Sequence, residues 1–163
     1  MKVSSQEEYG LRCMVQLARR QKAGRREPLT LGEVARDEGL TVAYVAKLVR
    51  MLRRAGLVTS VLGRAGGYSL ARDAERITLL EIINALGGKM YDTNYCDRFP
   101  GEQEVCTHMG DCSIRSLWGV LKGLIDGVLV QTSLSDLVST ERGMTAVLDG
   151  RRAAAAPASG GCR

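Results

Sequence analysis

Three cysteines between residues 96 and 112 are the residues whose type and spacing best support chemistry. Nine residues separate Cys96 from Cys106, and five separate Cys106 from Cys112. Zinc sites usually contain cysteine pairs about two to four residues apart, and this stretch has none. Three thiolates with looser spacing and an incomplete fourth position fit an iron–sulfur cluster with a non-cysteine ligand. Three free or disulfide-forming thiols fit the same spacing equally well.

A second chemical feature is the uneven distribution of charge. Lys and Arg number 23 against 18 Asp and Glu, and residues 1–76 alone hold 15 basic and 8 acidic residues. The net charge of +7 on this half suits a polyanionic partner, because contacts with phosphates release condensed counterions. Aromatic residues make up only 4% of the chain, which argues against recognition of single strands by base stacking. Double-stranded DNA is therefore the predicted partner.

The elements that must position these residues begin with three helices. Apolar residues at helical spacing predict a helix over residues 5–22. Thr30 opens a short second helix that ends at Gly39, and Thr41 caps a third that stops at Gly56. The inward face of the third helix is predicted to consist of Val42, Val45, Leu48, Val49 and Leu52.

A hairpin follows these helices. Residues 57–62 and 68–71 are rich in strand formers and flank a glycine-rich turn. Two helices joined by a tight turn at residues 38–40, followed by a hairpin, define a winged helix-turn-helix. The predicted fold class is mostly α with a small β wing, and residues 1–76 are its DNA-binding domain.

Residues 77–142 are predicted to hold the cysteine loop and the dimerisation helices. Thr78 caps a helix that runs to about Leu86, and a long helix begins at Ser113. An apolar stripe of this long helix suits packing against a second copy, although a core helix gives the same pattern. The stripe comprises Ile114, Leu117, Trp118, Leu121, Leu124, Ile125 and Val128. A short apolar segment after Ser133 follows.

The two ends of the chain carry further predictions. The first eight residues are acidic and contain no apolar signal core, which favours a cytoplasmic protein. No apolar run reaches the roughly 20 residues that span a bilayer. Residues 143–163 are predicted to be a disordered tail, which includes Cys162. Cys13, in the first helix, is predicted to be a packing residue.

Helical spacing predicts the surface that reads DNA. Lys47, Arg50 and Arg54 form a row away from the apolar stripe of the third helix, a pattern that tracks phosphates or base edges in a major groove. Arg64 lies at the tip of the wing and is predicted to reach a minor groove. Each of these residues alone also fits a solvated surface. The remaining predicted DNA-binding residues are Thr30, Thr41, Ala43, Tyr44, Gly66 and Gly67, the two glycines through positive φ and close approach to the DNA backbone.

Over roughly residues 1–142 the chain resembles the winged-helix repressors of the IscR/NsrR type, the Rrf-two family. The resemblance is carried by the segments 5–11, 42–48, 52–58 and 63–68, and by the loop of three cysteines followed by Ser116-Leu-Trp118. It implies a homodimeric transcription regulator with a 2Fe–2S or 4Fe–4S cluster. Redox change, nitric oxide or loss of the cluster would then alter operator affinity.

The resemblance also implies ligands. Cys96, Cys106 and Cys112 would bind the cluster, and Glu8, an acidic residue just before the tyrosine of the first helix, would supply the fourth ligand from the partner subunit. Relatives with a histidine ligand place it three residues after the last cysteine, where this chain has Arg115. The only histidine, His108, is therefore the second choice. Glu8 also fits an ordinary first-turn carboxylate that the helix dipole favours.

Three other functions remain open from the sequence. A metal-free regulator would switch through reversible disulfides among the three loop cysteines. A regulator that senses a small apolar metabolite at the dimer helix would have the same DNA-binding half. A metal-dependent enzyme or an electron carrier would leave the basic half without a role. Because the chain offers no base–nucleophile constellation, a non-enzymatic function is predicted.

Overall fold

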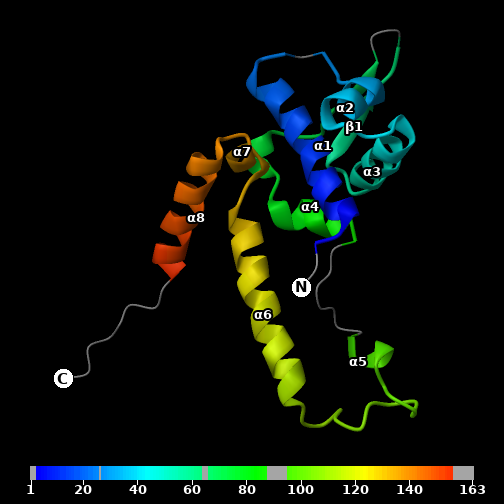
Figure 1. Ribbon diagram of the computed structural model, residues 1–163, viewed down its shortest axis with the longest axis vertical. Helices are drawn as coiled ribbons and strands as arrows, with labels where there is room; N and C mark the ends of the chain where they lie inside the picture. The colour runs from blue at the N-terminus through cyan, green and yellow to red at the C-terminus, as the bar shows by residue number, and fades with distance from the viewer. Residues whose placement is uncertain (1–2, 26, 64–65, 88–94, 156–163) are drawn as a thin grey trace, which may run out of the picture.

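The computed structural model describes residues 3–25, 27–63, 66–87 and 95–155 (Figure 1). A mostly helical fold carries one two-stranded antiparallel sheet, which confirms the predicted fold class. The order along the chain is α1 (Ser5–Lys22), α2 (Leu31–Glu38), α3 (Val42–Arg54), β1 (Val58–Val61), β2 (Gly67–Leu70), a 3-10 turn η1 (Ala74–Arg76), α4 (Leu79–Ala85), α5 (Tyr95–Arg98), α6 (Ser113–Gln131), α7 (Leu134–Leu137) and α8 (Glu141–Ala155).

Local capping sets where most of these helices begin. A hydroxyl accepts the backbone N–H three residues on, and the acidic side chain at that position accepts the N–H of the capping residue. This reciprocal pair is complete at α1, α2, α4 and α7, whose capping residues are Ser4, Thr30, Thr78 and Ser133. Thr41 caps α3 through its hydroxyl alone. The predicted starts at Thr30, Thr41, Thr78 and Ser133 are confirmed.

The turn between α2 and α3 is the tight turn that the sequence predicts. Gly39 adopts a left-handed conformation, with φ +66°, that favours glycine. The backbone N–H of Leu40 donates to the carbonyl of Ala35 at 2.8 Å and closes the end of α2. Glu38, just before the turn, accepts hydrogen bonds from Arg12 at 2.6 Å and from Gln16. Helix α1 therefore holds the helix-turn-helix at its turn.

One core unites α1, α2, α3, the wing and α4. Leu48, Leu52 and Ile82 are completely buried, so α4 packs into the same core although it lies beyond residue 76. Val42 is 52% exposed, which corrects its predicted place on the inward face. Its position in the first turn of α3 puts it beyond the edge of the helices that cover the rest of the stripe.

The wing is a hairpin with an added strand-like contact. Strand β1 pairs with β2 in the register Val58↔Leu70 to Val61↔Gly67. Leu29, just before α2, forms a bridge to Tyr68 with two backbone hydrogen bonds of 2.8 and 2.9 Å. This bridge fastens the loop between α1 and α2 to the outer side of β2.

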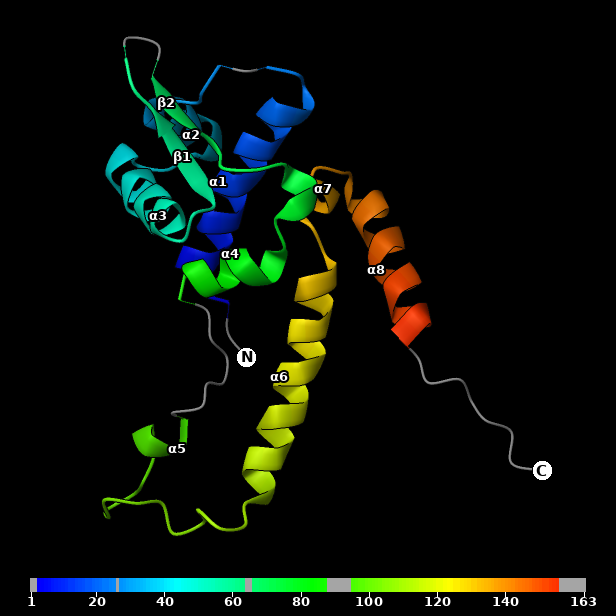
Figure 2. The same ribbon diagram turned by 180° about the vertical axis from the view of Figure 1, so that it is seen from behind.

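Helices α6 and α8 extend away from this module, whereas α7 packs against it and buries Leu134 completely in its core (Figure 2). The bridge Thr78↔Ser133 and a hydrogen bond from the N–H of Leu79 to the carbonyl of Thr132 join the α6–α7 junction to the start of α4. No helix of the described residues is long and apolar enough to cross a membrane.

The predicted disordered tail is wrong for residues 143–155, which belong to α8. This segment is held in place by Arg151, whose guanidinium contacts the carboxylate of Asp136 and the hydroxyl of Thr132. A tertiary contact therefore outweighs the alanine-rich, weakly apolar composition that indicated disorder. Residues 156–163, with Cys162, lie outside the described part of the chain.

Candidate nucleic-acid interface and cysteine loop

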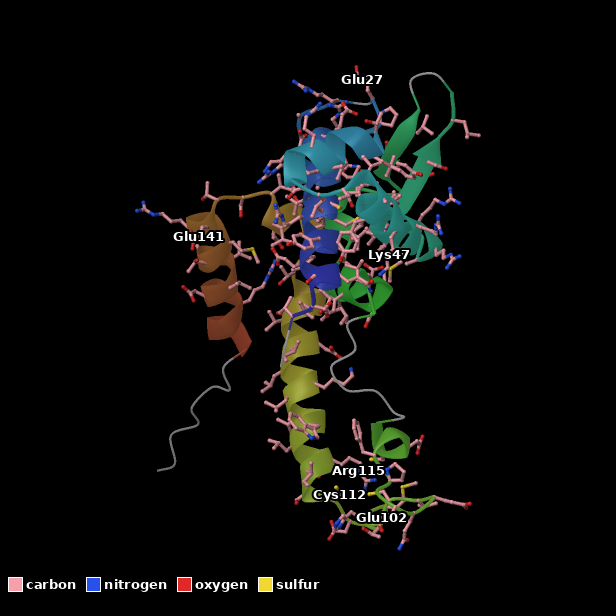
Figure 3. The ribbon with its side chains drawn as sticks, turned by 45° about the vertical axis from the view of Figure 1, so that its right-hand side comes forward. Glu27, Lys47, Glu102, Cys112, Arg115 and Glu141 are labelled. Atoms are coloured by element: carbon pink, nitrogen blue, oxygen red, sulfur yellow. The ribbon has the colours of Figure 1, made fainter. Side chains whose placement is uncertain are left out.

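The basic row of α3 is present on the surface of the module. Lys47, Arg50 and Arg54 are all exposed, whereas Leu48 and Leu52 of the same helix are buried beneath them. Figure 3 shows Lys47 on α3. The helix thus offers three cations to solvent on the face opposite the core, as a helix that enters a major groove does.

The first turn of α3 carries short side chains that are exposed to solvent. Thr41 and Ala43 are exposed, and the hydroxyl of Thr41 accepts the N–H of Tyr44 at 3.3 Å. Val42 adds an exposed methyl surface that sequence reasoning assigned to the core. Apolar groups at such positions contact thymine methyl groups. Periodicity predicts which residues share a helix face, but it does not predict that Val42, the first residue of this face, is exposed to solvent.

Tyr44 is half-buried and takes part in a chain of ring contacts. The ammonium of Lys47 lies 5.9 Å from the centre of the Tyr44 ring, and this ring forms an edge-to-face pair with Tyr9 of α1 at a centroid distance of 6.0 Å. The guanidinium of Arg12 lies 5.4 Å from the centre of the Tyr9 ring. These contacts fix Tyr44 between α1 and the basic row.

Arg53 is a candidate interface residue that sequence reasoning missed. Its guanidinium donates to the hydroxyl of Ser60 on β1 at 3.4 Å, and the arginine is exposed. It therefore places a further cation between the reading helix and the wing. In the sequence, the adjacent pair Arg53-Arg54 at the end of the helix was the feature that could have indicated this role for Arg53.

The wing glycines act differently from the prediction. The positive φ in the described part of this turn belongs to Gly63, at +114°, and not to Gly66 or Gly67. A Cβ on Gly67 would lie 2.6 Å from the carbonyl oxygen of Leu29, and one on Gly66 would lie 2.5 Å from that of Val61. Both glycines therefore allow close approach between backbone segments of the protein itself, at Leu29 and at Val61, and this differs from the predicted approach to the DNA backbone. Arg64, the predicted tip residue, lies outside the described residues.

Thr30 is exposed, but its hydroxyl is engaged in the capping pair with Glu33. These hydrogen bonds lower the pKa of Glu33 below its usual value, the backbone N–H of Thr30 having the largest effect. Thr30 consequently secures the start of α2. Its place as a DNA contact stays a prediction.

The cysteine loop lies at the far end of α6 from the module (Figure 3). Cys96 is in α5, and Cys106 and Cys112 follow on the irregular segment that leads into α6; all three are free and half-buried. The Sγ of Cys112 caps α6 by accepting the backbone N–H of Arg115 at 3.4 Å. The Arg115 guanidinium donates to the carbonyl of Met109 at 3.1 Å.

The donor chemistry of this loop suits an iron–sulfur cluster, but its side chains are not assembled around one centre. Among the described residues, no three His, Cys, Asp or Glu side chains come together as a metal site. His108 is exposed on the same loop, and Glu8 is exposed on α1, which lies apart from the loop in every view. A carboxylate at residue 8 therefore reaches these cysteines only from another subunit or after the loop moves.

The structure contains a helix-turn-helix, whose second helix is the basic reading helix α3, followed by a wing. This arrangement defines the class of winged-helix DNA-binding transcription regulators. Residues 3–140 match the family model Rrf2, described as an iron-dependent transcriptional regulator, and the chain belongs to this family. The protein rrf2 of Nitratidesulfovibrio vulgaris is 34% identical over 138 residues, covering 85% of this chain and 87% of that protein. This confirms the resemblance that the sequence motifs indicate.

Two solved structures share the fold and differ in what their titles describe. CymR of B. subtilis, titled the global cysteine regulator, has a TM-score of 0.66 and 31% identity, and covers 85% of this chain and 96% of its own. IscR of T. potens has a TM-score of 0.63 and 30% identity, with coverages of 96% and 93%. The fold therefore occurs both in a protein named IscR and in a regulator of cysteine.

Proposed function

We propose that this protein is a homodimeric, cytoplasmic transcription regulator whose affinity for its operator is controlled by an iron–sulfur cluster. The observation that carries the proposal is the trio of free, half-buried thiols on one loop whose last member, Cys112, caps α6. A ligand at this position is joined directly to the helix that carries the apolar face.

A second copy of the chain is the proposed cover for α6. None of its 19 residues is buried, and Leu117, Val120 and Leu124 are 55%, 62% and 65% exposed. An apolar face of this extent on a surface helix marks an interaction site. Pairing through α6 would present two reading helices to the two half-sites of an operator.

The proposed ligands are Cys96, Cys106 and Cys112, with Glu8 of the partner subunit in the fourth place and His108 as the second choice. A 2Fe–2S cluster is favoured over 4Fe–4S. When bound, the group supplies a redox-active centre that nitric oxide or oxidants can attack, and a carboxylate is a harder and weaker ligand for its iron than a thiolate. Glu8 would clamp α1 of one subunit to the loop of the other and set the spacing of the two modules.

The cluster is tested by iron and sulfide content per chain and by the visible spectrum of protein purified without air. We expect iron, sulfide and visible absorption in the unsubstituted protein, loss of all three in Cys106→Ala, and no change in Cys162→Ser. Glu8→Gln should lower retention of the cluster in air, whereas His108→Gln should not. Colourless, iron-free protein would refute the cluster.

DNA binding through α3 is tested with a duplex selected by the unsubstituted protein from random-sequence DNA. Arg54→Gln should weaken binding and reduce the slope of log affinity against log salt by about one, because one phosphate contact is lost. Arg142→Gln, an exposed arginine of α8, is the matched control and should leave the slope unchanged. An equal slope for all three proteins would remove Arg54 from the interface.

A metal-free thiol switch is the second candidate, favoured by the free thiols and by the likeness to CymR. In this case two of the loop cysteines would be oxidised to a disulfide with loss of two electrons and two protons to an added oxidant. Mass spectrometry after mild oxidation of the iron-free protein would then find one such pair. DNA affinity would follow that pair and not the iron content.

A further inference from the structure

The α1–α4 junction lies between the cysteine segment and the DNA-reading helix. Helix α4 ends at Ala85, and Leu86 and Gly87 lead toward the segment that carries Cys96. The side-chain amide of Gln6 in α1 donates to the carbonyl of Leu86 at 2.5 Å. The first turns of α1 are therefore attached to the start of the chain segment that leads to the cysteines.

The same junction is closely packed. A Cβ on Gly10 would lie 2.4 Å from Cδ1 of Leu86, so the leucine fills the space above the glycine. Leu86 is 1% exposed and belongs to the core. Because close-packed interiors transmit displacements, a shift of Leu86 must move the first two turns of α1 or open a void.

On an adjoining face of α1, Tyr9 contacts the reading helix. Its ring meets that of Tyr44 edge to face, with centroids 6.0 Å apart and planes at 84°. Tyr44 lies under the ammonium of Lys47 in the basic row. Edge-to-face pairs have a preferred geometry, so the position of one ring constrains the other.

We infer that Tyr9 is a positioning residue: it transmits displacements of the α1–α4 junction to Tyr44 and so to the DNA-reading face of α3. The junction enters this path through Gln6 and Gly10, and Tyr9 lies between them on the same two turns of helix. A regulatory role for this path rests on the proposed function. In that role, a change in the cysteine loop would alter DNA binding by the same chain. The path itself does not require a cluster.

The test is a double-mutant cycle on iron-free protein, with affinity for the selected duplex as the readout. Gln6→Ala releases the carbonyl of Leu86 and should weaken binding by about threefold or more, a size typical of coupling between sites. In the Tyr9→Phe background, which keeps the ring, the effect should persist. In the Tyr9→Leu background, Gln6→Ala should change affinity hardly at all.

Gln21→Ala is the matched control, because Gln21 of the same helix also holds a backbone group through its side chain, accepting the N–H of Ala74 at 2.9 Å. It lies at the opposite end of α1 from Tyr9 and should leave DNA affinity unchanged. An equal loss from Gln21→Ala, no loss from Gln6→Ala, or an undiminished loss in the Tyr9→Leu background would each overturn the inference.

Hydrogen exchange supplies a readout that does not depend on Tyr9→Leu being folded. Amides in the first two turns of α3 should exchange faster in Gln6→Ala than in Gln21→Ala, and unchanged exchange there would contradict the path.

A separate experiment compares the DNA affinity of iron-loaded protein with that of iron-free protein. The ratio of these two affinities should be closer to one in Tyr9→Leu than in the unsubstituted protein at equal iron content. Failure of the cluster hypothesis removes this last comparison and leaves the cycle intact.

Discussion

Cysteine shows at the level of single residues how environment separates chemistry from packing. Cys13 is 1% exposed in α1, whereas Cys96, Cys106 and Cys112 are half-buried on or beside an irregular loop. Burial raises the pKa of the Cys13 thiol to about 11. Since the thiolate is the nucleophile and the metal ligand, Cys13 is unsuited to either role, and the prediction that it is a packing residue is confirmed.

Cys13 should resist alkylation in the native protein. At pH 8 a thiol of pKa about 11 is ionised in roughly one molecule in a thousand, and its burial adds a steric barrier. Iodoacetamide followed by peptide mapping of reduced, iron-free protein should therefore label the three loop cysteines and leave Cys13 unmodified. In concentrated urea Cys13 should react as well. Labelling of native Cys13 at the rate of Cys106 would show that α1 is not packed as described.

At the level of elements, long-range polar contacts decide which segments are ordered. Helix α8 contacts the rest of the chain through Arg151, which reaches Asp136 at 2.8 Å and the buried Thr132 at 2.9 Å. Burial by itself raises the pKa of Asp136, but the hydrogen bonds from Arg151 and from the backbone N–H of Ser133 outweigh it and hold the pKa below its usual value. The carboxylate form is thus the one that holds α8.

Arg151→Ala should release α8 and lower the melting temperature at pH 7, by an amount that corresponds to about 1 kcal/mol for a partly exposed charged contact. A carboxyl with a depressed folded pKa contributes stability above its unfolded pKa of about 4 and loses it as the pH falls further. The difference in melting temperature between Arg151→Ala and the unsubstituted protein should accordingly narrow from pH 7 to pH 3. Arg142→Ala, on the same helix, should show no such dependence.

At the level of the whole molecule, the unpaired apolar face of α6 is the dominant feature. Ile114, Leu117 and Leu124 are more than half exposed on a helix that projects beyond the module (Figure 1). Exposed apolar area on this scale is costly in water, and in the proposed dimer a second α6 would cover it without any change in the module. Two modules held together also bind two half-sites far more tightly than either alone.

Leu124→Glu should convert the proposed dimer to monomers and weaken binding to a two-half-site duplex by at least about tenfold, because the carboxylate would be desolvated in the interface. The monomer should keep its fold, since Leu124 is 65% exposed. Gly119→Glu, on a different face of α6 and with open space around its Cβ, is the matched control. Sedimentation and anisotropy measure the two effects, and a Leu124→Glu variant that remains dimeric would exclude α6 as the interface.

The sequence alone determined the helix starts, the turn at Gly39 and the basic row of α3, because capping pairs and helical periodicity operate over a few residues. It also revealed the family through the cysteine loop and the wing. The tertiary structure alone decided that Tyr9 meets Tyr44, that Leu86 fills the space at Gly10, and that Arg151 orders α8. These pairs join segments up to 76 residues apart, and their geometry depends on how whole helices pack, which no local pattern encodes.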